Sequence, residues 1–112
     1  MSTKPADLIQ HQLDAYNRQD LEAMLACYAP DCVIAGLNGN ITETSRDALR
    51  ARYAKTFAEY PHNRATLVNR IHVGNTVIDH EDVSRGPGQD RFEVIAIYTV
   101  KNGLIARVDF AK

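Results

Sequence analysis

The segment from Val68 to Val83 contains two alternating apolar stretches separated by Gly74-Asn75. A two-residue turn of this kind joins adjacent antiparallel strands and sets which residues face each other. It predicts four cross-strand pairs: Val73 with Thr76, His72 with Val77, Arg70 with Asp79, and Val68 with Glu81. Side chains alternate across a strand, so one face carries Arg70, Asp79 and Glu81 beside Val68, Val77 and Val83. Buried charges are costly unless they are paired, so an inward orientation of this face predicts a polar cavity.

Length, composition and charge indicate a single globular domain and argue against several kinds of partner. A chain of 112 residues suits a single domain over 1–112, and 45% apolar with 24% charged residues is typical of a globular protein. A net charge of -1 argues against nucleic acid or an anionic membrane as a partner. No apolar run approaches the ~20 residues of a membrane span, and the start from Met1 to Pro5 lacks the apolar core of a signal peptide. We expect a cytoplasmic location.

Helical signals dominate the first half of the chain. Ile9, Leu13 and Tyr16 recur at helical spacing between Pro5 and Asn17, and Asp20 is a good N-cap for a second, shorter helix that Pro30 stops. Thr44-Ser45-Arg46-Asp47 matches a capping box and opens a third helix, closed by Pro61, with the apolar stripe Leu49, Tyr53 and Phe57. Arg50, Arg52 and Lys55 on this helix are interpreted as solvated flanks, with an anion site as the alternative.

Strand signals follow the helices. Short strands are predicted at Cys32–Ala35 and Asn40–Thr42, and four longer ones at 65–73, 76–84, 91–99 and 104–111, with a loop at Arg85–Asp90. Helices followed by an antiparallel meander predict an α+β fold in which helices cover one face of a curved sheet. Such a concave space is a common place for a small ligand.

Cys27 and Cys32 are five residues apart. Two thiols alone do not make a zinc site, and free cysteines commonly pack as small apolar residues, so no metal is expected. Catalytic thiol chemistry is the alternative.

Several short sequence motifs resemble those of one known group of proteins. The chain is similar to the nuclear transport factor 2-like superfamily, in its SnoaL-like and ketosteroid isomerase-like branch, through Tyr16-Asn17-Arg18-Gln19-Asp20-Leu21, Tyr28-Ala29-Pro30-Asp31, Asn69-Arg70-Ile71, Ile78-Asp79-His80-Glu81, Ile97-Tyr98 and Asn102-Gly103-Leu104-Ile105. The resemblance implies a cone-shaped, cystatin-like fold of three helices on a curved antiparallel sheet. It also implies a small-molecule pocket and a homodimer formed through the outer face of the sheet. It does not select one activity.

The catalytic residues of ketosteroid isomerases can be compared with this sequence position by position. Ketosteroid isomerases use a Tyr and a protonated Asp as donors and another Asp as the base. Counted from the shared motifs, these three positions fall at Gln12, Ile95 and Gly36, none of which has the required chemistry. The sequence therefore argues against ketosteroid isomerisation by that mechanism.

The last hairpin predicts which face of the sheet points inward. A loop over Val100–Gly103 would pair Ile95 with Val108 and Glu93 with Phe110, placing Ile95, Val108 and Phe110 in the pocket wall with Glu93. Phe92, Val94, Ala96 and Tyr98 would then form an apolar outer patch for the dimer. A five-residue loop at Arg85–Gln89 would also bring Glu81 beside Glu93, with Arg70 as the cation between carboxylates. Inverted faces would instead group Asn69, His80 and Asp82, a weak metal-binding set.

Two functions are compatible with these residues. The first is a cofactor-free acid-base enzyme of isomerase, cyclase, dehydratase or hydrolase type, with Asp79, Glu81, Glu93 and Arg70 as catalytic residues. The second is a non-catalytic ligand-binding or dimeric assembly module in which the same cluster is structural. In both, the predicted apolar wall comprises Tyr16, Tyr28, Tyr53, Phe57, Ile95, Val108 and Phe110.

Overall fold

The computed structural model describes residues 4–112, and its elements follow the predicted order of helices and then strands. The first residues of the predicted N-terminal start, 1–3, lie outside this range. The helices are α1 (Pro5–Asn17), α2 (Leu21–Leu25) and α3 (Arg46–Glu59). The strands are β1 (Tyr28–Gly36), β2 (Ile41–Glu43), β3 (Arg64–Val73), β4 (Thr76–Ser84), β5 (Phe92–Lys101) and β6 (Leu104–Ala111).

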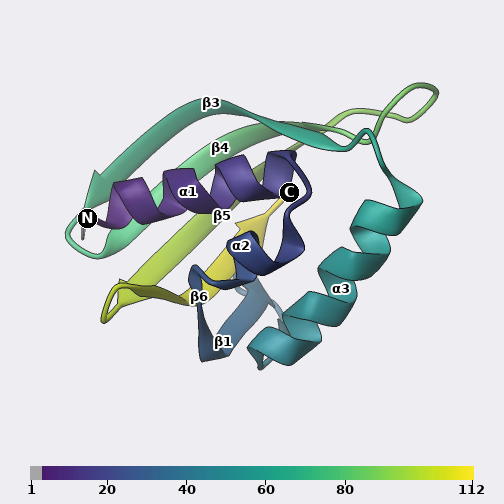
Figure 1. The fold of residues 1–112 in the computed structure, drawn as a ribbon. Helices are drawn as coiled ribbons and strands as arrows, with labels where there is room; N and C mark the ends of the chain where they lie inside the picture. The colour runs from purple at the N-terminus through teal and green to yellow at the C-terminus, as the bar shows by residue number, and fades with distance from the viewer. Residues whose placement is uncertain (1–3) are drawn as a thin grey trace.

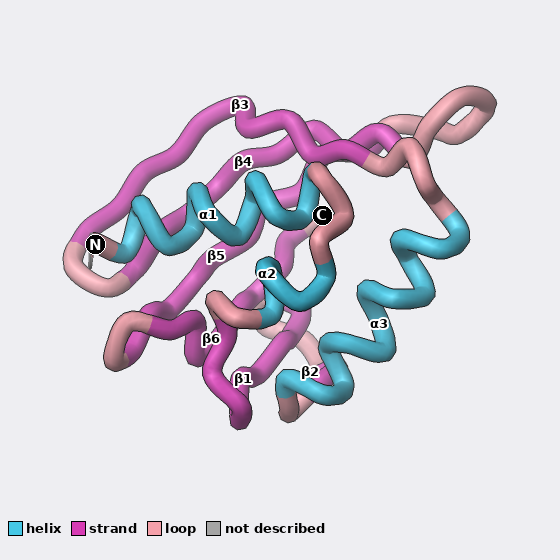
Figure 2. Tube along the Cα trace, viewed as in Figure 1, coloured by secondary structure: helices cyan, strands magenta, loops and turns pink. Residues whose placement is uncertain are grey.

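The six strands form one sheet in the order β2-β1-β6-β5-β4-β3. All neighbours are antiparallel except β1 and β6, which are parallel. The sheet bends around α1 and α2, which lie on the same side of it, while α3 stands beyond the end of α1 (Figures 1 and 2). The predicted α+β fold with helices on one face of a curved sheet is confirmed.

Local capping explains where the helices begin. The Asp20 side chain accepts a hydrogen bond from Ala23 N at 3.2 Å, which satisfies a free N–H at the start of α2. Ser45, one residue later than the predicted Thr44, caps α3 by accepting from Ala48 N at 3.1 Å. The Asn17 side chain exchanges two hydrogen bonds with the backbone of Ala65, at 2.9 and 2.8 Å, and so fixes the end of α1 against β3.

The main core lies between the helices and the concave face of the sheet. Its fully buried side chains come from every layer, and they include Ile9, Met24, Leu25, Ile34, Leu49, Val77, Ile105 and Val108. Cys27 and Cys32 are free and buried in this core, as predicted. Burial raises the pKa of the Cys27 thiol, which disfavours the thiolate that nucleophilic chemistry requires.

The predicted register of β3 and β4 is correct near the turn. Val73 pairs with Thr76, His72 with Val77 and Arg70 with Asp79. The fourth pair is wrong, because a bulge between Leu67 and Asn69 leaves Val68 unpaired and places Leu67 opposite Glu81. Val68 is consequently 53% exposed. On β4 the alternate residues Val77, Asp79, Glu81 and Val83 are buried, so the predicted inner face of this strand is confirmed.

The predicted register of β5 and β6 is wrong. Asn102 and Gly103 have φ values of 53° and 77°, so they form a two-residue turn in which Lys101 pairs with Leu104. This turn alone would shift the predicted pairing by two residues and keep the faces, but a bulge follows it, because β6 advances from Ile105 to Arg107 while β5 moves from Val100 to Thr99. The total shift is therefore odd, so Tyr98, not Ile95, lies on the inner face opposite Val108. Val94, Ala96 and Tyr98 are buried, which contradicts their predicted place in an outer patch.

Two predicted pocket residues on β5 consequently face outward. Ile95 is 41% exposed. The Glu93 side chain is 69% exposed and lies opposite Asp82, where its Oε1 is 2.7 Å from His80 Nε2. The predicted contact between Glu81 and Glu93 is wrong, because Glu81 pairs with Val94.

Candidate functional site

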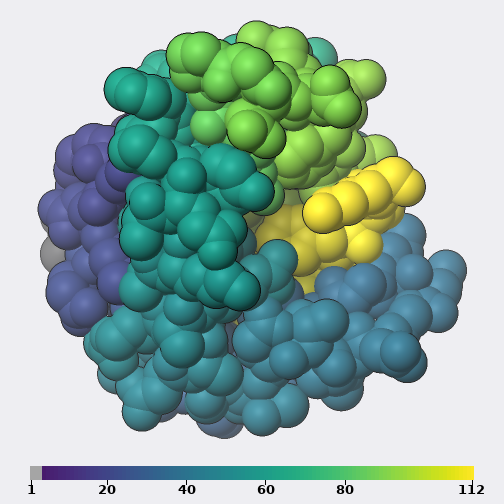
Figure 3. All heavy atoms as spheres, turned by 90° about the vertical axis from the view of Figure 1, so that its right-hand side faces the viewer, coloured from purple at the N-terminus to yellow at the C-terminus, as the bar shows by residue number. Residues whose placement is uncertain are grey.

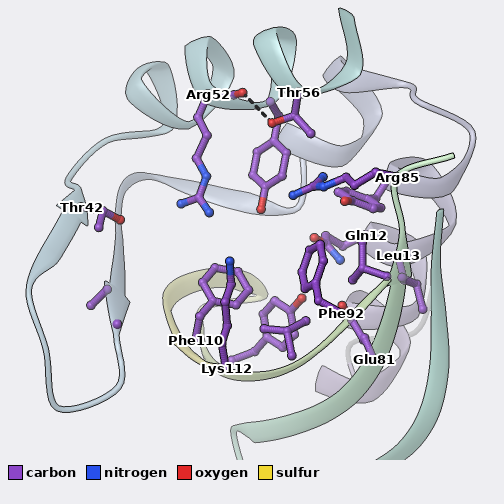
Figure 4. A pocket seen from close by; sticks show the side chains of 17 residues that line it. Gln12, Leu13, Thr42, Arg52, Thr56, Glu81, Arg85, Phe92, Phe110 and Lys112 are labelled. Carbon is purple, nitrogen blue, oxygen red and sulfur yellow. Dashed lines mark hydrogen bonds between the residues drawn. The ribbon is translucent and has the colours of Figure 1, made fainter. Parts of the chain in front are cut away.

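The concave side of the sheet contains a pocket of about 350 Å³. Its lining comes from α1, α3, β1, β2, β4, β5 and β6 and from the residues that follow β4 and β6. It consists of Gln12, Leu13, Tyr16, Ala35, Gly36, Thr42, Arg52, Tyr53, Thr56, Glu81, Val83, Arg85, Phe92, Val94, Tyr98, Phe110 and Lys112. Figure 3 shows the end of the molecule where α3, the loop after β4, the C-terminal segment and the β1–β2 region meet. Figure 4 shows the lining from close by. The volume is in the range of small-molecule sites.

Glu81 is the acidic residue of this lining, and it lies between apolar neighbours. Leu67 on β3 and Val94 on β5 are its cross-strand partners. The residue is 7% exposed, and its Oε2 has no hydrogen-bond partner among residues 4–112. Burial, and then the charge of Asp79, raise the pKa of Glu81 to about 7, while Arg70 opposes them. A carboxyl group with this pKa can exchange a proton with a ligand near neutral pH.

Asp79, two residues earlier on the same face, has a different environment. It is completely buried, and Arg70 holds both of its oxygens, with Nε 2.6 Å from Oδ1 and Nη2 2.9 Å from Oδ2. Arg70 Nη1 also donates to Gln10 Oε1 at 2.8 Å. The guanidinium therefore holds one carboxylate and not two, and neither Asp79 nor Arg70 lines the pocket.

Three phenol groups face the pocket. Burial raises the pKa of Tyr53 to about 12 and that of Tyr98 well above its usual range. Burial also raises the pKa of Tyr16, although its hydrogen bond with Asn63 and the charge of Arg85 oppose the shift. Asn63 Nδ2 donates to the Tyr16 hydroxyl oxygen at 2.6 Å. All three phenols keep their protons at neutral pH, so they are available as hydrogen-bond donors.

Buried hydrogen bonding also orients Gln12. The Tyr28 hydroxyl donates to Gln12 Oε1 at 2.9 Å, so the amide oxygen is occupied behind the pocket wall. Gln12 lines the pocket at the position that the isomerase comparison assigned to a Tyr, and Gly36 lines it at the position assigned to the base. The third position, assigned to the protonated Asp, fell at Ile95, which faces outward. Its inward neighbours Val94 and Ala96 are also apolar. The structure therefore places none of the three isomerase side chains at the compared positions.

The predicted site residues therefore divide into three groups. Glu81, Tyr16, Tyr53 and Phe110 line the pocket. Tyr28, Phe57, Val108, Asp79 and Arg70 lie behind it or beside it, with Phe57 packed edge-on against Tyr16 at 5.6 Å. Glu93 and Ile95 lie on the opposite face of the sheet.

Sequence reasoning missed the cationic part of the lining. Arg85 lies in the predicted loop, and the sequence favours Arg52 as a solvated flank, with an anion site only as the alternative. Arg52 instead donates to Glu43 Oε1 at 2.6 Å and lies 5.4 Å from the Tyr53 ring. The alternation of Val77, Asp79, Glu81 and Val83 reaches Arg85 if it is continued by one step beyond β4. Continued from Val108 and Phe110, the same alternation reaches Lys112.

The alternative with inverted faces is wrong, since Asp79 and Glu81 point inward. In the described part of the chain, no three His, Cys, Asp or Glu side chains are arranged to hold a metal ion. None of the described helices combines the length and apolar composition needed to cross a bilayer.

Residues 9–108 match the model of the SnoaL-like domain family. The chain belongs to this family. A comparison with curated proteins gives no match.

Solved structures with the same fold include an uncharacterised cystatin-fold protein from Novosphingobium aromaticivorans. It is 28% identical, the alignment covers 100% of this chain and 99% of that one, and the TM-score is 0.91. A candidate polyketide cyclase from Sinorhizobium meliloti is 23% identical over 94% of both chains, with a TM-score of 0.79. A candidate ketosteroid isomerase from Kribbella flavida is 19% identical over 95% of this chain and 75% of that one, with a TM-score of 0.79. These similarities agree with the predicted superfamily.

Proposed function

We propose that this protein is a cofactor-independent enzyme that moves a proton on a small, partly apolar molecule, with Glu81 as general base and then general acid. The observation that carries the proposal is the Glu81 carboxyl group, which is buried in the pocket wall with one oxygen unpartnered and a pKa of about 7. Near neutral pH such a group is about half ionised, which suits it for both directions of proton transfer.

The phenols supply the second half of the chemistry. When Glu81 removes a proton beside a carbonyl group, negative charge develops on the carbonyl oxygen. Tyr16, Tyr53 and Tyr98 are protonated donors in the same pocket, and donors positioned where charge develops stabilise the transition state. The Tyr16 oxygen already accepts from Asn63, which leaves its own proton for a ligand. Proton transfer of this kind serves isomerases, dehydratases and aldol-type cyclases, and membership of the SnoaL-like family supports such a role.

A probe reaction tests Glu81 without knowledge of the natural substrate. 5-Nitrobenzisoxazole is small, planar and apolar. A base takes its C3 proton, the C–H electrons complete the nitrile, and the N–O bond breaks to release a coloured phenolate. We expect the wild-type protein to accelerate this reaction above equimolar acetate, with an apparent pKa near 7 in the pH profile. Glu81→Gln should lower the rate by roughly 10²-fold or more, the usual contribution of a general base.

Glu93→Gln is the matched control, because Glu93 is a carboxylate on the outer face of the same sheet. Its rate should stay within about twofold of wild type, since surface substitutions away from a site have small effects. Equal rates for Glu81→Gln and wild type would rule out Glu81 as the base.

The alternative function is a binding module without turnover. The Arg70–Asp79 pair supports a structural role for these two residues, because the two charges bind each other outside the pocket. A protein that binds planar apolar molecules but gives no acceleration of the probe reaction would meet this description.

We also propose a homodimer through the outer face of the sheet, as the family resemblance implies. The exposed apolar residues of this face are Val68, Ile71, Val73 and Ile95, which replace the buried set predicted from sequence. Light scattering at micromolar concentration should give twice the monomer mass, and Ile71→Lys with Ile95→Lys should reduce it to the monomer. A wild-type monomer would contradict this proposal.

A further inference from the structure

The charges in the pocket lining are unequal. Three cationic side chains, Arg52, Arg85 and Lys112, accompany the single carboxyl group of Glu81. Arg52 is paired with Glu43 at 2.6 Å. Arg85 and Lys112 have no carboxylate within 4.0 Å in the part of the chain that the structure describes. Within residues 4–112, two of the three pocket cations therefore have no carboxylate in contact with them.

Arg85 is held in position by neutral groups. Its Nη1 donates to Asn63 Oδ1 at 2.9 Å, and its guanidinium carbon lies 5.1 Å from the ring centres of both Tyr60 and Phe92. Asn63 is only 3% exposed and is itself bonded to Tyr16. A guanidinium has five N–H donors, and this arrangement leaves most of them for a ligand. Restricted side-chain freedom lowers the entropic cost of binding.

Lys112 approaches the same aromatic ring. Its Nζ lies 5.1 Å from the centre of the Phe92 ring, the distance also found for Arg85. Figure 4 shows the Arg52, Arg85 and Lys112 side chains reaching into one cavity. Because both contact the Phe92 ring, the two charged groups lie no more than about 10 Å apart, and an anion bound between them would reduce their mutual repulsion. An Arg fork matches the two oxygens of a carboxylate, and an ammonium group adds a point charge.

We propose that the pocket selects organic carboxylates with a planar apolar body, and that Arg85 and Lys112 bind the carboxylate. The rest of the lining suits the apolar body, since Tyr53, Phe92, Phe110 and Val94 form much of the wall. The proposal deepens the proposed function and rests on it for orientation. The Glu81 carboxylate repels a second anion, so the ligand carboxylate lies at the cationic side and its apolar body extends toward Glu81.

Calorimetry with two probes of nearly equal shape tests the charge preference. 2-Naphthoate carries a carboxylate, and 2-naphthamide replaces it with a neutral amide. The wild-type protein should bind 2-naphthoate more tightly by roughly tenfold or more, and this preference should shrink as salt is added. Arg85→Gln and Lys112→Gln should each reduce the preference, and together they should remove it, while affinity for 2-naphthamide stays within about twofold.

Arg107→Gln is the control, because Arg107 is an exposed guanidinium paired with Asp109. It should keep the full preference. If Arg85→Gln does not fold, Lys112→Gln alone and the salt dependence of the wild type still test the charge preference. Equal affinities for the two probes, no binding of either, or a preference that survives Arg85→Gln with Lys112→Gln would each overturn the proposal.

Glu81→Gln separates this proposal from the proposed function. It should bind 2-naphthoate at least as tightly as wild type, because a repelling carboxylate is removed, even though it no longer accelerates the 5-nitrobenzisoxazole reaction. Loss of the reaction with an intact preference supports both proposals. Anion preference with no wild-type reaction supports the binding site and contradicts the enzyme.

Discussion

Asp79 and Glu81 are both carboxylic acids on the inner face of β4, separated by one residue, yet their surroundings differ. Asp79 lies between Arg70 on β3 and Ala96 on β5, and a bidentate guanidinium holds its two oxygens. Glu81 lies between Leu67 and Val94, and the pKa of its carboxyl group rises to about 7. The cross-strand neighbour therefore decides whether an inward carboxylate stabilises the fold or remains available for chemistry.

The largest expected effect on stability concerns Asp79. Arg70→Ala leaves a fully buried carboxylate without its cation, and breaking such a pair costs about 3–5 kcal/mol of unfolding free energy. Urea denaturation should therefore show a much lower midpoint for this variant.

Arg107→Ala provides the exposed counterpart. Its side chain is 44% exposed in the pair with Asp109, so we expect a loss below about 1 kcal/mol. If Arg70→Ala cost no more than Arg107→Ala, the Arg70–Asp79 pair would not be the structural element described above.

A smaller effect, of opposite sign, is expected at Glu81. The pKa of this carboxyl group is about 7 in the folded protein, above its ordinary value of 4.5. Between these pH values the folded state keeps a proton that the unfolded state has lost, so stability falls as pH rises and then levels off above pH 7. Glu81→Gln removes this cost and should be more stable than wild type at pH 8, by at most about 3 kcal/mol.

The same comparison at pH 4 should give nearly equal stabilities, because Glu81 is then protonated in the folded protein. Urea denaturation of both proteins at the two pH values measures the difference. A stability gap that does not change with pH would mean that Glu81 titrates normally, and the comparison with Asp79 would lose its basis.

Much of the fold follows from local sequence signals. The turn at Gly74-Asn75 predicted the pairing of Arg70 with Asp79 and put Asp79 and Glu81 on one face, which is the inner face in the structure. The bulge at Val68 was not visible, because an extra residue in a strand has no sequence marker here. Its effect was confined to the far end of β3.

The errors in the site have one main cause. Treating Asn102-Gly103 as part of a four-residue loop shifted β5 by two residues, and the bulge between Val100 and Thr99 added a third. An odd shift reverses the faces, so the prediction put Glu93 and Ile95 inward and Tyr98 outward. Asn-Gly is a strong signal for a two-residue turn, but the bulge that reverses the faces has no marker in the sequence. Arg85 and Lys112 were missed for another reason, since each lies one step past the end of its strand.

The parallel pairing of β1 and β6 has a consequence for how the chain reaches its fold. β6 lies between β1 and β5, so the first long strand to be synthesised borders the last one. The β3–β4–β5 meander can form from neighbouring segments, but β1 cannot join the sheet until Leu104–Ala111 has emerged from the ribosome. Contacts this distant in sequence slow folding. The closure of the pocket, which needs Gly36 from β1 and Phe110 from β6, is therefore expected to be a late event in folding.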